Sequence, residues 1–180
     1  MKAVLDACVL YPTVLREILL GCAQAGLYVP VVSDRILREW VLATAKLGPE
    51  APLIAEGEAA ALRAKFPKAI IPVHAGVESR LHLPDPNDVH VLATAIAGHA
   101  DCIVTFNAQD FPGHVLAEEG LARRDPDGFL WEMHSANPEA VEQVVNAVHD
   151  TACRLSGQDL ALKGLLKRAK LFRLARAITG

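Results

Sequence analysis

Three acidic side chains stand at positions where a folded chain could use them for chemistry. Asp6 directly follows a short apolar run, Glu39 interrupts the apolar face of a predicted helix, and Asp88 lies in the first turn of another predicted helix. Ligands of open α/β sheets bind outside the carboxyl ends of the parallel strands. We therefore expect the three carboxylates to converge at one edge of a sheet.

A second set of polar residues follows the most clearly predicted strand, in the segment VTFNAQDF. Thr105, Asn107 and Asp110 belong to it, and the last two could equally be turn residues. Several carboxylates at one edge repel one another unless a cation neutralises them. Mg²⁺ prefers carboxylates and water, and a pair of such ions can activate water in phosphodiester hydrolysis. The sequence thus predicts a metal site, with Asp110 as its weaker member.

Each acidic residue also has a structural interpretation. Asp6 could accept hydrogen bonds from a helix N-terminus. Glu39 could be a surface charge beside Arg38. Asp85 and Asp88 are suited to starting a helix, and we interpret Asp85 as its cap.

The elements that would position these residues alternate between strand and helix. Apolar β-branched runs predict strands at 2–5, 27–32, 69–73 and 101–106. Helical spacing predicts helices from 12, after Ser33, from about 50 to 66, and over 87–99. This order predicts an α/β fold with a central parallel sheet and helices on both faces.

Residues 1–130 are expected to form this body, and residues 131–180 a helical C-terminal extension. In the extension, Asn137 and Pro138 can begin a helix to about 155, and a last helix is predicted over 158–178.

Charge is unevenly distributed along the 180 residues. Residues 158–180 hold six Lys or Arg and one Asp. The net charge of the whole chain is −3, so the net charge of the first 157 residues is −8. An acidic body argues against binding duplex nucleic acid over a broad face. Any contact with nucleic acid is expected to be local.

Composition indicates a globular protein of the cytoplasm. The first apolar run contains an Asp and has no small-residue cleavage site, so we expect no signal peptide, and no segment suggests a membrane span. The four cysteines, each in an apolar stretch, are expected to be buried free thiols in a reducing compartment rather than disulfides or a zinc site: Cys8, Cys22, Cys102 and Cys153.

Three segments together resemble the PIN-domain nucleases, in particular the VapC-type toxins of bacterial toxin-antitoxin pairs. They are VLDACVLYP, ILREW and LPDPNDVHVLATAIAGHADCIVTFNAQDFP. By this resemblance Asp6, Glu39 and Asp88 match the family's three acidic metal positions, and Thr105 and Asn107 match the polar pair near the fourth. Relatives carry Asp where this chain has Asn107, so either three carboxylates suffice or Asp110 contributes.

The resemblance implies a Mg²⁺-dependent endoribonuclease, with Mn²⁺ as a substitute, that pairs as a homodimer and is silenced by an antitoxin protein. Such toxins cut a tRNA or a loop of ribosomal RNA. The basic extension resembles that of a subset of these toxins and could contact phosphates, although the same residues could dock on the acidic body. These residues are Lys163, Lys167, Arg168, Lys170, Arg173 and Arg176.

Other classes with an Asp after the first strand fit less well. Haloacid-dehalogenase-like phosphatases need a second Asp where this chain has Cys8, and the Gly-rich turn of a dinucleotide or P-loop site does not occur in the sequence. The remaining alternative is a catalytically inactive PIN-fold module that binds RNA or protein, which Asn107 favours. Metal dependence would separate the two.

Overall fold

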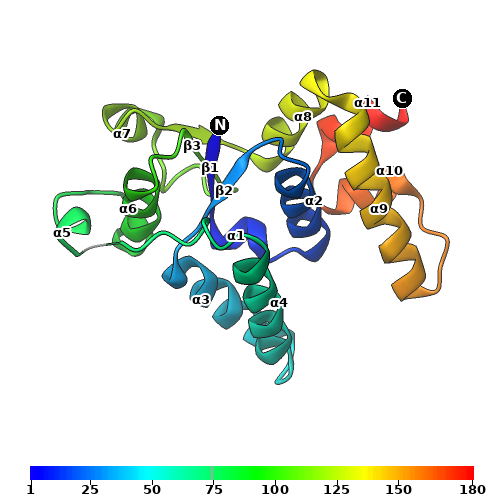
Figure 1. Ribbon diagram of the computed structural model, residues 1–180, viewed down its shortest axis with the longest axis horizontal. Helices are drawn as coiled ribbons and strands as arrows, with labels where there is room; N and C mark the ends of the chain where they lie inside the picture. Colours follow the sequence, from blue (N-terminus) through cyan, green and yellow to red (C-terminus); the bar gives the residue numbers. More distant parts are fainter. Residues whose placement is uncertain (74) are drawn as a thin grey trace. The chain divides into compact units, whose positions relative to one another are not determined.

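The fold contains a parallel four-stranded sheet (Figure 1). The computed structural model describes residues 1–73 and 75–180. The sheet order is β2-β1-β3-β4, with β1 at Lys2–Leu5, β2 at Val29–Val31, β3 at Cys102–Val104 and β4 at Ala122–Arg124. Strands β1 and β3 are the inner pair, and each is almost entirely buried.

Helices flank the sheet, which confirms the predicted α/β class. The described α-helices are α1 (Ala7–Leu10), α2 (Thr13–Gln24), α3 (Asp34–Ala43), α4 (Ala51–Lys65), α5 (Ala75–Glu78), α6 (Val89–Ala97), α7 (Gly113–Glu118), α8 (Pro126–Ala136), α9 (Pro138–Ser156), α10 (Leu162–Arg168) and α11 (Phe172–Thr179). Two short 3₁₀ helices are η1 (Thr44–Leu47) and η2 (Pro86–Asp88).

The chain divides into two compact units. The first consists of Met1–Tyr11 and Val29–Arg124 and contains the sheet. Its core is formed by the side chains of β1 and β3 and by the apolar helix α6, which packs on both strands. Because α6 is apolar on nearly every face, it is buried along most of its length.

Local signals in the sequence explain where two of these helices begin. The hydroxyl of Ser33 accepts a hydrogen bond from the amide of Ile36 at 3.3 Å and caps α3. The carboxylate of Asp85 accepts one from the amide of Asn87 at 2.9 Å, and Pro86 takes the first position of η2. The predicted cap at Asp85 is confirmed, and it sets the start of the segment that carries Asp88.

The second unit consists of Pro12–Tyr28 and Asp125–Gly180 and is helical. Helix α2 packs against α9 so closely that a Cβ at Gly21 would lie 2.5 Å from Cγ1 of Val144. Asp127 of α8 is buried and accepts hydrogen bonds from the backbone amides of Arg173 and Leu174 at 2.8–3.1 Å. This carboxylate therefore fixes the first turn of α11 on α8. The domain boundary near residue 130 stays a prediction.

The predicted strand at 69–73 is wrong. The described part of that segment makes a single parallel bridge, Val32 to Ile70, because the partner chain leaves the sheet at Ser33, which caps α3. The predicted last helix, 158–178, is also wrong, since α10 and α11 are separate. Lys170 adopts a left-handed φ of 61°, and the amide of Leu171 bonds to the carbonyl of Leu166 at 2.9 Å. That closing turn is the usual end of a helix, although Lys stands where Gly is favoured.

Two sequence expectations concern membrane spans and cysteines. Among the residues that the structure describes, none of the helices has both the length and the apolar character that a bilayer span requires. The four cysteines are reduced thiols; Cys22 and Cys102 are buried, whereas Cys8 and Cys153 are partly exposed.

Candidate metal centre

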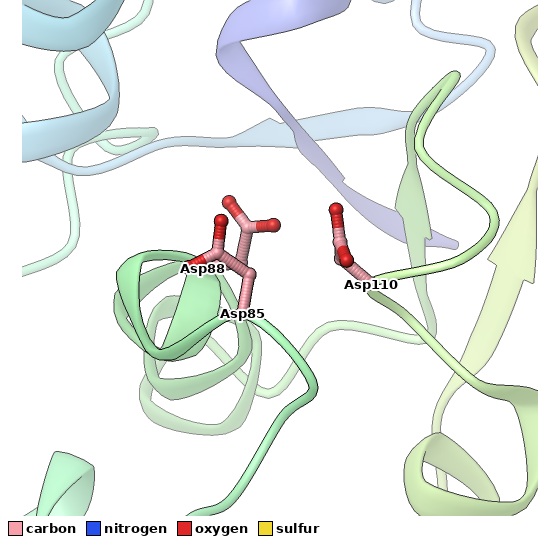
Figure 2. A group of neighbouring side chains, drawn as sticks. All are labelled: Asp85, Asp88 and Asp110. Carbon is pink, nitrogen blue, oxygen red and sulfur yellow. The ribbon is translucent and has the colours of Figure 1, made fainter.

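Three aspartates in the first unit bring their carboxylates together. Ligand oxygens of Asp85, Asp88 and Asp110 all lie within 4.8 Å of one another, and each side chain is partly buried. Asp85 and Asp88 come from the turn that begins α6, whereas Asp110 comes from the segment that follows β3 (Figure 2). Two pieces of chain that are distant in sequence thus contribute to one acidic group.

Asp88 is at the electrostatic centre of this group. Its pKa is raised from the ordinary 3.8 to about 6, first by burial and then by the negative charges of Asp6, Asp85, Asp110 and Glu39, in decreasing order. Four other carboxylates therefore lie close enough to Asp88 to oppose its ionisation. A cation bound there would relieve this repulsion.

Asn107 links two of the carboxylates. Its side-chain amide donates to Oδ2 of Asp88 at 3.2 Å and to Oδ2 of Asp110 at 2.5 Å. Both acceptors are carboxylate oxygens, so the NH₂ group and not the carbonyl of the amide must face them. The amide holds Asp88 and Asp110 together but adds no positive charge.

Asp6 and Thr105 lie side by side because of the register of the sheet. Leu5 of β1 pairs with Val104 of β3, so the residues that follow the two strands are neighbours. The Thr105 hydroxyl donates to Oδ2 of Asp6 at 2.7 Å. The same hydroxyl oxygen accepts a hydrogen bond from the backbone N–H of Asn107 at 2.9 Å. Both side chains are almost fully buried. Thr105 therefore couples the orientation of Asp6 to that of the segment carrying Asn107.

The Asp6 carboxylate does not cap the helix that follows it. Asp6 is the residue before α1, but its side chain makes no capping hydrogen bond there. Its second donor is the thiol of Cys8, at 3.1 Å from Oδ2. Within the described residues both side-chain donors thus reach Oδ2, which leaves Oδ1 for another ligand. The structural interpretation of Asp6 as a helix cap is therefore wrong.

Cys8 is a hydrogen-bond donor in this site rather than a nucleophile. Burial, followed by the charge of Asp6, raises the pKa of its thiol to about 12. The thiol is consequently protonated at neutral pH and can donate to Asp6. It also lies 3.4 Å from the hydroxyl of Thr105.

Glu39 of α3 is held at the margin of the acidic group. One of its oxygens, Oε1, lies 2.8 Å from Nε2 of His90 and 3.5 Å from Nε of Arg35. Its side chain is 37% exposed, so it is neither a core residue nor a fully solvated charge. Its negative charge contributes to the raised pKa of Asp88.

The segment that carries Asn107 and Asp110 is fastened to the last strand. Arg123 of β4 donates from one guanidinium nitrogen to the carbonyls of Ala108, at 2.7 Å, and Phe111, at 2.8 Å. The Phe111 side chain is fully buried. These contacts fix both ends of the turn and hence the position of Asp110.

The donor set fits a hard divalent cation. Mg²⁺ and Mn²⁺ take carboxylate oxygens and water, and one or two carboxylates are enough for Mg²⁺. Asp88 and Asp110, with Asp85 beside them, supply oxygens from both sides of the group. The raised pKa of Asp88, caused first by burial and then by the neighbouring carboxylates, reflects the same crowding of negative charge.

The structure brings most of the expected site residues into one network. Asp88, Asp110 and Asn107 are in direct contact, Asp6 and Thr105 adjoin them through hydrogen bonds, and Glu39 reaches Asp88 through its charge. The basic residues of the extension belong to the second unit and are exposed: Lys163, Lys167, Arg168, Lys170, Arg173 and Arg176.

Sequence reasoning overlooked three members of this neighbourhood. Asp85 was interpreted only as a cap, but a capping carboxylate uses one oxygen and keeps the other. Cys8 was expected to be a buried core thiol, and its position two residues after Asp6 was the available signal. His90 sits in a helix so apolar that only its spacing from Asp88 marked it.

Comparison with known proteins gives a family but no individual relative. Residues 2–109 match the model of the PIN domain, a span that includes every carboxylate of the site except Asp110. The comparisons with curated proteins and with solved structures gave no significant match. The family match covers more than half of the chain and contains Asp6, Glu39, Asp85 and Asp88, but not Asp110. The chain therefore belongs to the PIN-domain family.

Proposed function

We propose that this protein is a metal-dependent endoribonuclease and the toxin of a type II toxin-antitoxin pair, acting in the cytoplasm on a structured RNA such as a tRNA or a ribosomal RNA loop. PIN domains are generally metal-dependent nucleases. The observation that carries the proposal is the group of aspartates around Asp88, whose excess negative charge calls for a cation.

The proposed catalytic residues are Asp6, Glu39 and Asp88, with Asp110 as a further ligand. A divalent cation held there would polarise a phosphoryl oxygen and activate water. Asp88 and Asp110 contribute oxygens that Asn107 aligns, and Asp6 contributes Oδ1 while Thr105 and Cys8 hold Oδ2. Asp85 is close enough to supply one more carboxylate oxygen.

The substrate part of the proposal rests on charge. Residues 1–157 carry a net charge of −8, whereas the basic residues of α10 and α11, and Lys170 between them, are exposed to solvent. Lys163, Lys167 and Arg168 lie on α10, and replacing all three by Ala should weaken RNA binding at any sequence. The slope of log affinity against log salt should fall by about 1 per residue removed. An unchanged slope would contradict a role in RNA binding.

Protein partners are part of the same proposal. Four large apolar side chains are exposed on the consecutive elements α3, η1 and α4: Leu42, Leu47, Leu53 and Ile54. The helices α3 and α4, which carry three of them, pack against each other, and exposed apolar surface is typical of protein interfaces. These side chains favour a homodimer or a bound antitoxin protein over a lone chain. A light-scattering mass equal to one chain at every concentration would contradict the homodimer.

The second candidate function is a PIN-fold module that binds RNA or protein without cleaving. The amide of Asn107 favours it, because hydrogen bonds from a neutral group join two carboxylates that a cation could otherwise join. Such a module should bind its target equally well in a chelator.

The decisive experiment uses total bacterial RNA as substrate. The purified protein is incubated in Mg²⁺, Mn²⁺ or EDTA beside Asp6→Asn and Asp88→Asn, with the exposed Asp159→Asn as the matched control, and new RNA ends are sequenced. Discrete metal-dependent ends, present in the control and absent from both site variants, would support the nuclease. Intact RNA together with chelator-resistant binding would support the binding module.

A further inference from the structure

His90 is a buried polar side chain that the proposed chemistry does not use. It lies on α6, two residues after Asp88, and is 1% exposed. Among the described residues, neither ring nitrogen has a hydrogen-bond partner with aligned geometry. A buried imidazole without partners costs free energy, so its position calls for an explanation.

The ring is directed at one particular oxygen. Nε2 of His90 lies 2.8 Å from Oε1 of Glu39, which is hydrogen-bond distance, although the N–H is not aligned with that oxygen. A ring lone pair facing a carboxylate oxygen at this distance would be repelled, so the Nε2–H tautomer is favoured. A rotation of the ring or of the carboxylate would be needed to align the hydrogen bond. Such bonds commonly align only in the loaded site.

Arg35, the cation beside Glu39, is a weaker anchor than His90. Arg35 approaches Oε1 at 3.5 Å from one helical turn earlier, and its side chain is 49% exposed. It is also shared with Glu78, at 3.6 Å. An exposed guanidinium divided between two carboxylates is screened by solvent and fixes neither of them firmly. The buried ring of His90 is therefore the contact that can determine where Oε1 lies.

We propose that His90 is a positioning residue, which donates from Nε2 to Oε1 of Glu39 and so turns Oε2 toward the acidic group around Asp88. The inference rests on the proposed function, since it takes Glu39 as a metal ligand. Hydrogen bonds from outer residues to ligating carboxylates fix their orientation, and their loss typically weakens metal affinity or activity 10- to 100-fold.

The test compares two amide substitutions that differ in reach. Gln at position 90 can place its NH₂ near the position of Nε2, whereas Asn reaches only the position of Nδ1. Binding of Mn²⁺ alone is measured by calorimetry for the wild type, His90→Gln, His90→Asn and Glu39→Gln, and for the double variant Glu39→Gln/His90→Asn. His90→Phe, which keeps a ring without the donor, replaces His90→Asn if the latter does not fold. Unfolding in EDTA is recorded for each.

We expect His90→Asn to weaken Mn²⁺ binding by about 10-fold or more, His90→Gln to stay within about 3-fold of the wild type, and the loss to disappear in the Glu39→Gln background. A purely structural role would instead make affinity follow stability in EDTA. The inference is overturned if His90→Asn binds like the wild type, if His90→Gln is as weak as His90→Asn, or if the loss persists without Glu39.

The failure of the proposed function has a different signature. If the wild type cuts no RNA while Glu39→Gln and His90→Asn still weaken Mn²⁺ binding, the nuclease proposal fails and the role of His90 stands. If Glu39→Gln binds Mn²⁺ as the wild type does, Glu39 is not a ligand and the role of His90 is overturned with it.

Discussion

Replacing Asp88 by Asn should stabilise the metal-free protein at neutral pH. The pKa of Asp88 rises from 3.8 to about 6 in the folded chain. Between these values the unfolded chain has lost its proton while the folded chain keeps it, so the free energy of unfolding falls as pH rises through this window. Above about pH 6 Asp88 is ionised in both the folded and the unfolded chain, so the full loss of unfolding free energy caused by its raised pKa is present. Asp88→Asn removes this loss.

The size of the effect follows from the pKa. The difference between the two pKa values corresponds to about 3 kcal/mol of unfolding free energy before solvent screening is considered. Asp88 is only partly buried, so solvent screening reduces this to about 1–2 kcal/mol at pH 7–8. At about 2–4 °C per kcal/mol for a chain of this size, the melting temperature of Asp88→Asn in EDTA should exceed that of the wild type by roughly 2–8 °C.

Urea unfolding at pH 4, 5, 6, 7 and 8 in EDTA measures the difference directly. Asp159→Asn, an exposed carboxylate in the second unit, is the matched control and should show no such trend. The difference between Asp88→Asn and the wild type should be near zero at pH 4 and grow toward pH 7. Millimolar Mn²⁺ should reverse the order, because the wild type binds the cation more tightly than Asp88→Asn does. A difference that does not change with pH would refute the repulsion argument.

Three further substitutions test individual contacts. Asn107→Asp adds a negative charge in place of the amide and should lower stability in EDTA while tightening Mn²⁺ binding, as calorimetry would show; weaker binding would contradict this. Thr105→Val removes the hydroxyl that donates to Asp6 and should cost about 1–3 kcal/mol of stability and reduce cleavage, whereas Thr105→Ser should restore both; equal loss in the two variants would rule out the hydrogen bond as the cause. Asp127→Ala leaves the first amides of α11 without their acceptor and should cost about 1–3 kcal/mol; hydrogen exchange should then rise in α11, and unchanged protection would show that its apolar face alone holds it.

The predictable parts of the fold are those with a local signal. β1 and β3 are short apolar runs, and Ser33 and Asp85 cap the helices that follow them. β4 was not predicted, because the sequence Ala-Arg-Arg has no apolar alternation and pairs only through the backbone of β3. The break at Lys170 was missed because no Gly or Pro marks it.

The site was predictable where it depends on strand ends. Asp6 and Thr105 follow neighbouring parallel strands, so the sheet alone makes them adjacent. Glu39 and His90 depend instead on how α3 and α6 come together, which no local pattern encodes. Asp85 shows a different limit, since a correct prediction of its capping role concealed that its carboxylate also faces Asp88 and Asp110.

Asn107 orients the carboxylates of the metal-free site without neutralising their charge. A neutral amide satisfies one oxygen each of Asp88 and Asp110, but it leaves the total charge of the group unchanged. The pKa of Asp88 is accordingly still about 6 with the amide in place. Alignment and neutralisation are therefore separate tasks: the amide performs the first, and only a proton or a cation can perform the second. The two must compete for Asp88 near pH 6, so the affinity of the site for a cation should decline as pH falls through that value.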